Sequence, residues 1–290
     1  MIKSKDLSTN FFVVLVLALS VIFTLMGIFL KNDIVLALQQ ATPIMATIIV
    51  CIMFFKEKHF KNIGINHIGK LRYYILALII PTLTLFISYF CGWILGFLKL
   101  GGKTQNALLE INFPVIKDVI KLFFFQDTMY SLNFFYIVLI WGVAEEVGWR
   151  GFLQPRFINK FGVKKGICLT GLIWAIWHYP LIISGQYYES GNVILNTVLF
   201  TVTVVIMGVS IGYVTYKTDS VWPAVIFHTK SNLTWQLCSV MFLSNNSNSI
   251  YLCGEAGIFN IIIWSIFAIL IFGKISKENK VVNKVNKTVN

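Results

Sequence analysis

Charged residues are scarce in this sequence, at 12 % of its 290 residues. Soluble domains carry about 25 % charged residues and about 45–50 % apolar ones. This chain is 57 % hydrophobic and has a mean hydropathy of +0.76. No polar stretch resembles a linker between two domains. The composition therefore argues against a soluble protein and predicts an all-α, multi-pass bundle of membrane-spanning helices.

Acidic residues are scarcer than basic ones, with 12 Asp and Glu against 24 Lys and Arg, for a formal net charge of +12. The basic residues are scattered between apolar stretches and form no continuous patch, which argues against a nucleic-acid partner. Loops that face an anionic inner leaflet account for such an excess. We therefore expect membrane lipids as partners and no nucleic acid.

The cysteine residues do not indicate a disulfide framework. The five Cys residues show no paired spacing and no Cys-x-x-Cys motif, so the sequence predicts neither a disulfide network nor a thiolate zinc site. Four of them lie in apolar runs, where cysteine packs as a small apolar side chain.

Eight apolar stretches approach the length of about 20 residues that crosses a membrane core as a helix. They cover residues 11–30, 34–55, 73–98, 132–148, 166–183, 193–216, 221–243 and 258–272. The first is longer than the about 7–15 apolar residues of a signal peptide, so we interpret it as a span. Between the third and fourth spans, residues 115–125 have the pattern of an amphipathic helix in the membrane interface.

The basic residues alternate across these spans. With the N-terminus inside, 18 of the 24 Lys and Arg residues fall in inner segments, 5 in outer segments and Lys230 inside the seventh span. The positive-inside rule then predicts that both termini are cytoplasmic. Three regions follow: residues 1–130 with three spans and the interfacial segment, 131–245 with four spans, and 246–290 with the last span and a basic tail.

Three charges cluster at the end of the fourth span, where a charge near hydrocarbon is costly. On a helix, Glu146 and Arg150 lie one turn apart and can pair, with the acid in the favourable N-terminal position. Glu145 points about 100° away and has no local cation, so it can face a cavity and exchange a proton. If the three merely capped the helix, two acids would oppose its dipole. We therefore expect Glu145, rather than Glu146, to carry the chemistry.

Two other spans carry buried polar groups. His178 lies in the fifth span, about 18 Å from its cytoplasmic start at the helical rise per residue. Pro180 has no N–H for the carbonyl of Ile176, which leaves an acceptor near the histidine. In the seventh span, His228 and Asn232 are four residues apart and share a helix face. Polar residues in such spans turn toward the bundle interior, so we expect the three spans to converge there.

A carboxylate, two imidazoles and an amide are side chains that can together catalyse the hydrolysis of a peptide bond. Glu145 would activate a water molecule, His178 would orient that water or share its proton, and His228 with Asn232 would donate to the developing oxyanion of a cleaved amide. The set Glu145, His178 and His228 could also hold a divalent metal such as zinc. The residues alone leave both alternatives open, and the His-Glu-x-x-His spacing of soluble zinc proteases is absent.

The three motifs resemble those of the CAAX prenyl protease and bacteriocin-processing family of intramembrane endopeptidases, also called the Abi family. They are Glu145-Glu146-x-x-x-Arg150, the aromatic-x-x-x-His of Trp174 and His178, and His228-x-x-x-Asn232. The resemblance covers about residues 133–243, with the motifs in the family's order. One departure is Trp174, where the family usually has Phe.

The resemblance implies an eight-helix membrane protease whose cavity opens to the cytoplasm. It assigns the water to Glu145 with His178 and the oxyanion to His228 with Asn232, while both metal-dependent and metal-free mechanisms have been proposed for the family. It also implies a membrane-associated peptide or protein substrate, in bacteriocin maturation or self-immunity, peptide signalling or envelope regulation. The Lys-, Asn- and Ile-rich composition favours the cytoplasmic membrane of a bacterium.

Two other hypotheses keep the same helices. A non-catalytic immunity or scaffold protein would retain the fold without cleaving a substrate. A proton-coupled transporter would use the buried groups as a relay, although the chain shows none of the internal repeats common in transporters.

Overall fold

The computed structural model describes residues 2–55, 63–100, 139–188, 190–245 and 248–289. The expected interfacial helix at residues 115–125 lies outside this part of the chain. The described residues form a polytopic helical bundle, as expected. Its helices are α1 (Ile2–Leu30), α2 (Asp33–Ala37), α3 (Thr42–Phe55), α4 (Leu71–Ile94), α7 (Gln154–Phe161), α8 (Val163–Trp177), α9 (Tyr179–Ile183), α10 (Val193–Thr218), α11 (Trp222–Met241), α12 (Ser249–Leu252) and α13 (Ile258–Val289).

Six helical segments in the described residues are long and apolar enough to cross a membrane. They are Asp6–Leu30, Asp33–Phe55, Leu71–Ile94, Val163–Ile183, Val193–Thr218 and Ile258–Glu278, and they match six of the eight predicted spans. The predicted seventh span corresponds to α11, which has the length of a span but carries several polar residues. The predicted fourth span begins outside the described residues. The count of eight therefore stays a prediction.

The predicted end of the fourth span at residue 148 is wrong. An α-helix over residues 139–146 continues through a π-helical segment, η3 (Val147–Leu153), into α7. This helix ends at Phe161 and is followed by Gly162, which has a φ of +80°. The three charges therefore do not cap a helix end. Their side chains lie inside the bundle, with exposed fractions of 3 % for Glu145, 0 % for Glu146 and 1 % for Arg150.

Two further boundaries differ from the sequence prediction. The predicted fifth span is broken at His178, between the end of α8 and the start of α9. The basic tail does not leave the last span at residue 272, because α13 continues as a helix to Val289. Two short strands were also not predicted: β1 (Leu98–Leu100) and β2 (Phe242–Ser244) pair antiparallel, with Lys99 opposite Leu243.

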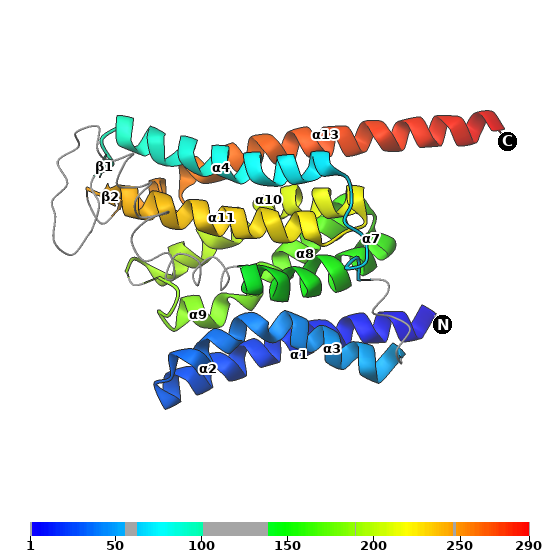
Figure 1. The fold of residues 1–290 in the computed structure, drawn as a ribbon, viewed down its shortest axis with the longest axis horizontal. Coiled ribbons are helices and arrows are strands. Elements are labelled where there is room, and N and C mark those ends of the chain that lie inside the picture. Colours follow the sequence, from blue (N-terminus) through cyan, green and yellow to red (C-terminus); the bar gives the residue numbers. More distant parts are fainter. Residues whose placement is uncertain (1, 56–62, 101–138, 189, 246–247, 290) are drawn as a thin grey trace.

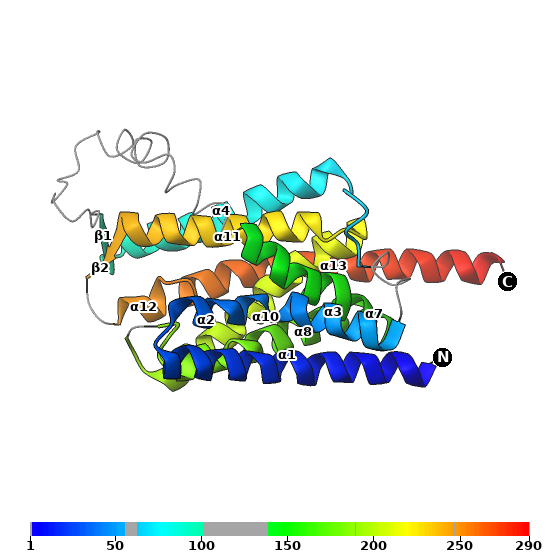
Figure 2. The same ribbon diagram turned by 60° about the horizontal axis from the view of Figure 1, so that its bottom comes forward.

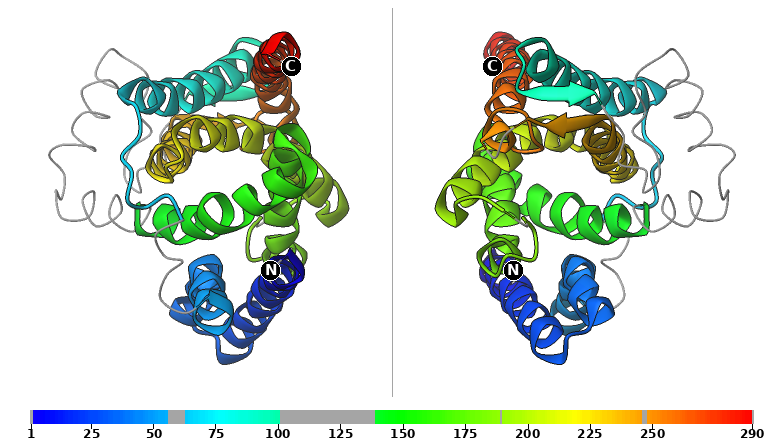
Figure 3. Two further views of the ribbon diagram at one scale, coloured as in Figure 1. Left: turned by 90° about the vertical axis from the view of Figure 1, so that its right-hand side faces the viewer. Right: turned by 90° about the vertical axis from the view of Figure 1, so that its left-hand side faces the viewer.

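Both termini lie at the same end of the bundle, and the β1–β2 pair lies at the other end (Figure 1). In this view α1, α2 and α3 form a lower layer, and α4 and α13 form the upper one. Turning the bundle brings α1 to the front along its whole length (Figure 2). The views along the bundle show α7 and α8 between these layers (Figure 3).

The core of the bundle is aromatic. Trp149, Trp174, Trp177, Phe12 and Phe152 are almost completely buried and belong to one apolar cluster. Phe12 of α1 stacks on Phe152 of η3 with ring centroids 4.7 Å apart, and Trp149 meets Trp177 of α8 edge to face at 5.6 Å. Such pairs add to the apolar area that burial removes from water. They fix η3, and with it the charged motif, against α1 and α8.

Candidate active site

One cavity brings together the four residues that the sequence singled out for chemistry. Its volume is about 410 Å³, and its lining includes Glu145, His178, His228 and Asn232. These side chains come from the helix over residues 139–146, from the break between α8 and α9, and from α11. The convergence expected from three separate spans is therefore present.

Glu145 faces this cavity and is held by an indole. Its Oε2 atom accepts a hydrogen bond of 2.8 Å from Nε1 of Trp174, which lies in the last turn of α8. The same indole ring carries the guanidinium of Arg150 on its face, 4.3 Å from the ring centroid. The sequence identified Trp174 only as an aromatic surface. Its donor function requires the indole nitrogen, which a phenylalanine lacks.

Glu146 points away from the cavity and joins two other motif residues. Its Oε1 atom accepts a hydrogen bond of 2.8 Å from Nη1 of Arg150, which is the expected pair one helical turn apart. The same oxygen also lies 2.9 Å from Nδ1 of His228 on α11. Glu146 is therefore more than a partner of Arg150, because it also orients a histidine that lies in the cavity lining. The sequence prediction missed this second contact.

The contact with Glu146 determines which His228 nitrogen is free. A carboxylate paired with an arginine accepts hydrogen bonds, so Nδ1 of His228 carries the proton that is donated to it. The Nε2 atom is then the one available to a substrate. It donates when the ring is protonated and accepts when the ring is neutral. The expected role of oxyanion donor requires the protonated ring.

His178 owes its orientation to the helix break. Its backbone N–H donates to the carbonyl of Ala175 at 3.1 Å. The carbonyl of Trp174 instead lies 3.0 Å from the ring nitrogen Nδ1 of His178. A carbonyl only accepts, so Nδ1 carries the hydrogen and Nε2 of the neutral ring has the free lone pair. The freed acceptor used by the histidine is thus the carbonyl of Trp174, rather than that of Ile176 as the sequence suggested.

Aromatic rings enclose His178. Its ring centroid lies 4.5 Å from that of Trp177, 4.8 Å from Phe200 and 5.6 Å from Tyr187, all edge to face. Such a shell restricts the rotation of the imidazole. A histidine held in one orientation and one tautomer can accept a hydrogen bond from a water molecule in a fixed direction.

A third carboxylate lies in the cavity and was not identified from the sequence. Glu255 precedes α13 and lines the cavity. Both of its oxygens lie 3.1 Å from the hydroxyl of Tyr187, which donates to the carboxylate. Burial raises the pKa of Glu255 to about 7, against the opposing effects of the Tyr187 hydrogen bond and of His228. The signal in the sequence was weak: a lone acid between two glycines, in a segment assigned to an outer loop.

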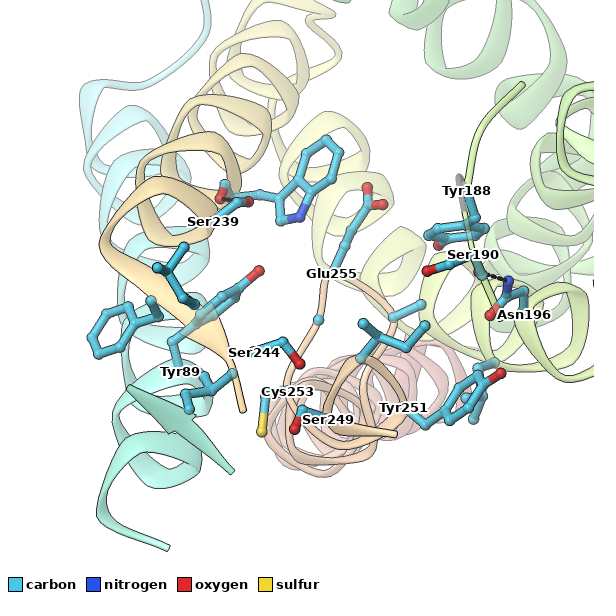
Figure 4. A pocket seen from close by; sticks show the side chains of 18 residues that line it. Tyr89, Tyr188, Ser190, Asn196, Ser239, Ser244, Ser249, Tyr251, Cys253 and Glu255 are labelled. Atoms are coloured by element: carbon cyan, nitrogen blue, oxygen red, sulfur yellow. Dashed lines mark hydrogen bonds between the residues drawn. The ribbon is translucent and has the colours of Figure 1, made fainter. Parts of the chain in front are cut away.

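A second cavity adjoins the first and shares two residues with it. Its volume is about 470 Å³, and its lining includes both Glu255 and Trp235, which also line the first cavity. Figure 4 shows the Glu255 side chain reaching toward the middle of this space, with Tyr188 on one side and Tyr89 on the other. The two cavities therefore meet at Glu255 and Trp235.

The expected metal ligands are Glu145, His178 and His228. In the described part of the chain, no three His, Cys, Asp or Glu side chains lie close enough together to hold an ion. One Glu145 oxygen accepts from Trp174, and each histidine uses Nδ1 for a protein contact. Nδ1 contacts of this kind also orient histidines that bind a metal through Nε2.

Comparison with known proteins places the site inside a matched region. The family model described as type II CAAX prenyl endopeptidase Rce1-like matches residues 127–234. A curated protein of Methanococcus maripaludis, CAAX prenyl protease 2, is 26 % identical over 189 residues, which cover 64 % of this chain and 65 % of the relative. The match thus spans slightly less than two thirds of the relative's length. The region matched by the family model contains Glu145, His178, His228 and Asn232, whereas Glu255 lies beyond it.

Proposed function

We propose that this chain is an intramembrane endopeptidase, because residues 127–234 match the family model of Rce1-like CAAX prenyl endopeptidases and a CAAX prenyl protease is similar to it over 189 residues. The proposal rests on one observation above all, the convergence of Glu145, His178, His228 and Asn232 on a single cavity. Its substrate is a membrane-associated peptide or protein, and membrane lipids surround the bundle.

In the proposed reaction, Glu145 is the general base. A water molecule between Glu145 and Nε2 of His178 loses a proton to the carboxylate as its oxygen attacks the scissile carbonyl carbon. The carbonyl oxygen becomes an oxyanion, which Nε2–H of the protonated His228 and the amide of Asn232 stabilise. The C–N bond then breaks, and Glu145 returns the proton to the leaving amine. Glu145 is thereby restored as a carboxylate, and the products are a carboxylic acid and an amine.

We place the enzyme in the cytoplasmic membrane of a bacterium, with both termini in the cytoplasm. The excess of basic residues on the side of the termini supports this orientation. Bacteriocin maturation or self-immunity is the proposed biological setting, on the basis of the family resemblance.

Replacement of the two water-activating residues tests the proposed activity. The chain is co-expressed with candidate membrane-peptide precursors, and the cleaved fraction is measured by mass spectrometry. Glu145→Gln and His178→Ala should each lower the cleavage rate by about 10²-fold or more, because each removes a group that handles the proton. Glu278→Gln is the matched control. It removes a carboxylate that pairs with Lys217 at 3.1 Å, far from the cavity.

Three outcomes distinguish the hypotheses. Loss of cleavage in the two site variants, with normal protein levels and normal cleavage by the control, supports the peptidase. Unchanged cleavage in both site variants contradicts it. If Glu145→Gln still protects cells in a bacteriocin challenge, the chain acts as a non-catalytic immunity protein instead.

A further inference from the structure

The cavity mouth lies at one particular end of the bundle. Three lining residues mark it: Asp33 begins α2, Gln186 follows α9, and Glu255 precedes α13. Asp33 and Gln186 are exposed. All three belong to connections at the end opposite both termini, where β1 and β2 also lie (Figure 1). Among the described residues, the exposed part of the cavity lining therefore lies at the end away from the N- and C-termini.

A separate cavity at the terminal end stops short of the site. It has a volume of about 250 Å³ and is lined by Gly64, Arg150, Gln154 and Ser220, among others. Neither Glu145 nor either site histidine belongs to its lining. The pair of Glu146 and Arg150 lies between the two spaces, and both side chains are almost completely buried. Entry to Glu145 from the terminal end is thus blocked by this pair.

Basic residues gather at the closed, terminal end. Among the described side chains, those in the connections and helix ends on that side are Lys70, Arg72, Arg156, Lys160, Lys164, Lys165, Lys217, Lys274 and Lys277. Two ion pairs bind these segments together: Lys160 with Asp6 at 2.9 Å, and Lys217 with Glu278 at 3.1 Å. At the open end, the described residues include only Lys31 and Lys99 as basic side chains.

We infer that the catalytic cavity opens on the extracytoplasmic side of the membrane and takes a peptide segment that has already been translocated. The bias of Lys and Arg sets the orientation of a multi-pass protein, with the richer side in the cytoplasm. With cytoplasmic termini, this fold places the cavity mouth on the opposite side of the membrane from the one that the family resemblance implies. That the cavity is catalytic rests on the proposed function, but the side of the membrane on which it opens does not.

The lining of the cavity adds a preference for substrate charge. Asp33, Glu145 and Glu255 contribute carboxyl groups, and Gln40, Gln186, Asn232 and Gln236 contribute amides. Among the described residues, the lining contains no Lys or Arg. A neutral or basic peptide segment complements this surface, whereas an acidic one is repelled.

Cysteine labelling in spheroplasts tests the orientation without any substrate. Gln186→Cys places a thiol at the cavity mouth, and Lys165→Cys places one at an exposed position of the opposite end. The unsubstituted chain gives the background of the five native cysteines. A membrane-impermeant maleimide should label Gln186→Cys in intact spheroplasts and Lys165→Cys only after permeabilisation.

The opposite labelling pattern would overturn the inference. If neither thiol reacts, alkaline phosphatase fused after Asn290 gives a second measurement. The fusion should be inactive, because the phosphatase is active only outside the cytoplasm, and an active fusion overturns the inference. Since neither measurement requires cleavage, a wrong orientation leaves the peptidase proposal intact, and an inactive peptidase leaves the orientation intact.

Discussion

Trp174 contacts more of the site than any other residue of the three motifs does. It donates to Glu145, its carbonyl accepts from His178, and its ring lies under Arg150 and edge to face with His228 at 5.3 Å. Only the contact with Glu145 depends on the indole nitrogen. The others would survive in a phenylalanine, which is the usual family residue at this position.

Trp174→Phe isolates that single hydrogen bond. A hydrogen bond to a charged group contributes about 1.5–3 kcal/mol, so we expect kcat to fall about 10-fold or more. KM should change little, because Trp174 positions the base and does not line the cavity. Steady-state kinetics on the purified protein measures the two separately. Trp174→Ala should in addition lower the melting temperature. Wild-type kcat in Trp174→Phe would show that the indole hydrogen bond has no part in positioning Glu145.

Glu255 makes the stability of the protein depend on pH near neutrality. Its pKa in the folded state is about 7, raised by burial above its ordinary value of 4.5. The folded state therefore binds the proton more tightly than the unfolded state does, and stability falls as pH rises from about 4.5 to about 7. The loss of stability across this range is at most about 3–4 kcal/mol, at 1.36 kcal/mol per pKa unit.

Glu255→Gln removes this titration while it keeps the shape of the side chain. Thermal unfolding in detergent, measured between pH 5 and pH 8, should show a smaller fall in melting temperature for the variant than for the unsubstituted chain. The buried Tyr187 hydroxyl can still bond to the glutamine oxygen, so the variant should fold. Identical pH profiles for the two proteins would mean that Glu255 does not titrate in this range.

The π-helical segment η3 is the element that determines where the charged motif lies. Two glycines let it approach its neighbours closely. A Cβ atom at Gly148 would lie 2.5 Å from Cβ of Pro43 in α3, and one at Gly151 would lie 2.4 Å from Cγ2 of Ile63. The close contact with α3 holds the following turn, including Arg150, against the rest of the core.

Gly148→Ala should therefore destabilise the protein, because Pro43 contributes rigid atoms that cannot move away. Overpacking of this kind costs about 1–3 kcal/mol, and thermal unfolding in detergent measures it. Gly273→Ala in α13 is the matched control, since a Cβ there meets nothing within 4 Å. The control should be neutral or slightly stabilising, because alanine is the better helix former. Equal melting temperatures for the two variants would contradict the packing account.

At the level of single helices, the helical periodicity of the sequence predicted some side-chain contacts and missed others. The spacing of Glu146 and Arg150 was enough to predict their pair, because it depends only on the turn of one helix. The contact of Glu146 with His228 joins residues 82 positions apart, and no local pattern specifies it. The end of the helix was misplaced because buried charges inside a bundle look like a polar boundary in sequence.

For the whole molecule, composition and hydropathy predicted the polytopic bundle, and six of the eight expected spans have matching helices. The order of the motifs along the chain predicted their convergence. Glu255 could not be predicted in the same way, because a loop residue reaches the site only through the packing of α11 against its neighbours. The relation between the cavity mouth and the termini likewise required the path of every helix.

The shared wall between the two cavities suggests a route to selective inhibitors. Small fragments can be screened for each space separately and then joined past Glu255 and Trp235, which border both. Linking raises affinity because the second fragment binds from a high effective concentration. A basic linker would meet the Glu255 carboxylate, which lies outside the part of the chain matched by the family model. Such a compound would contact a carboxylate that the three motifs do not supply.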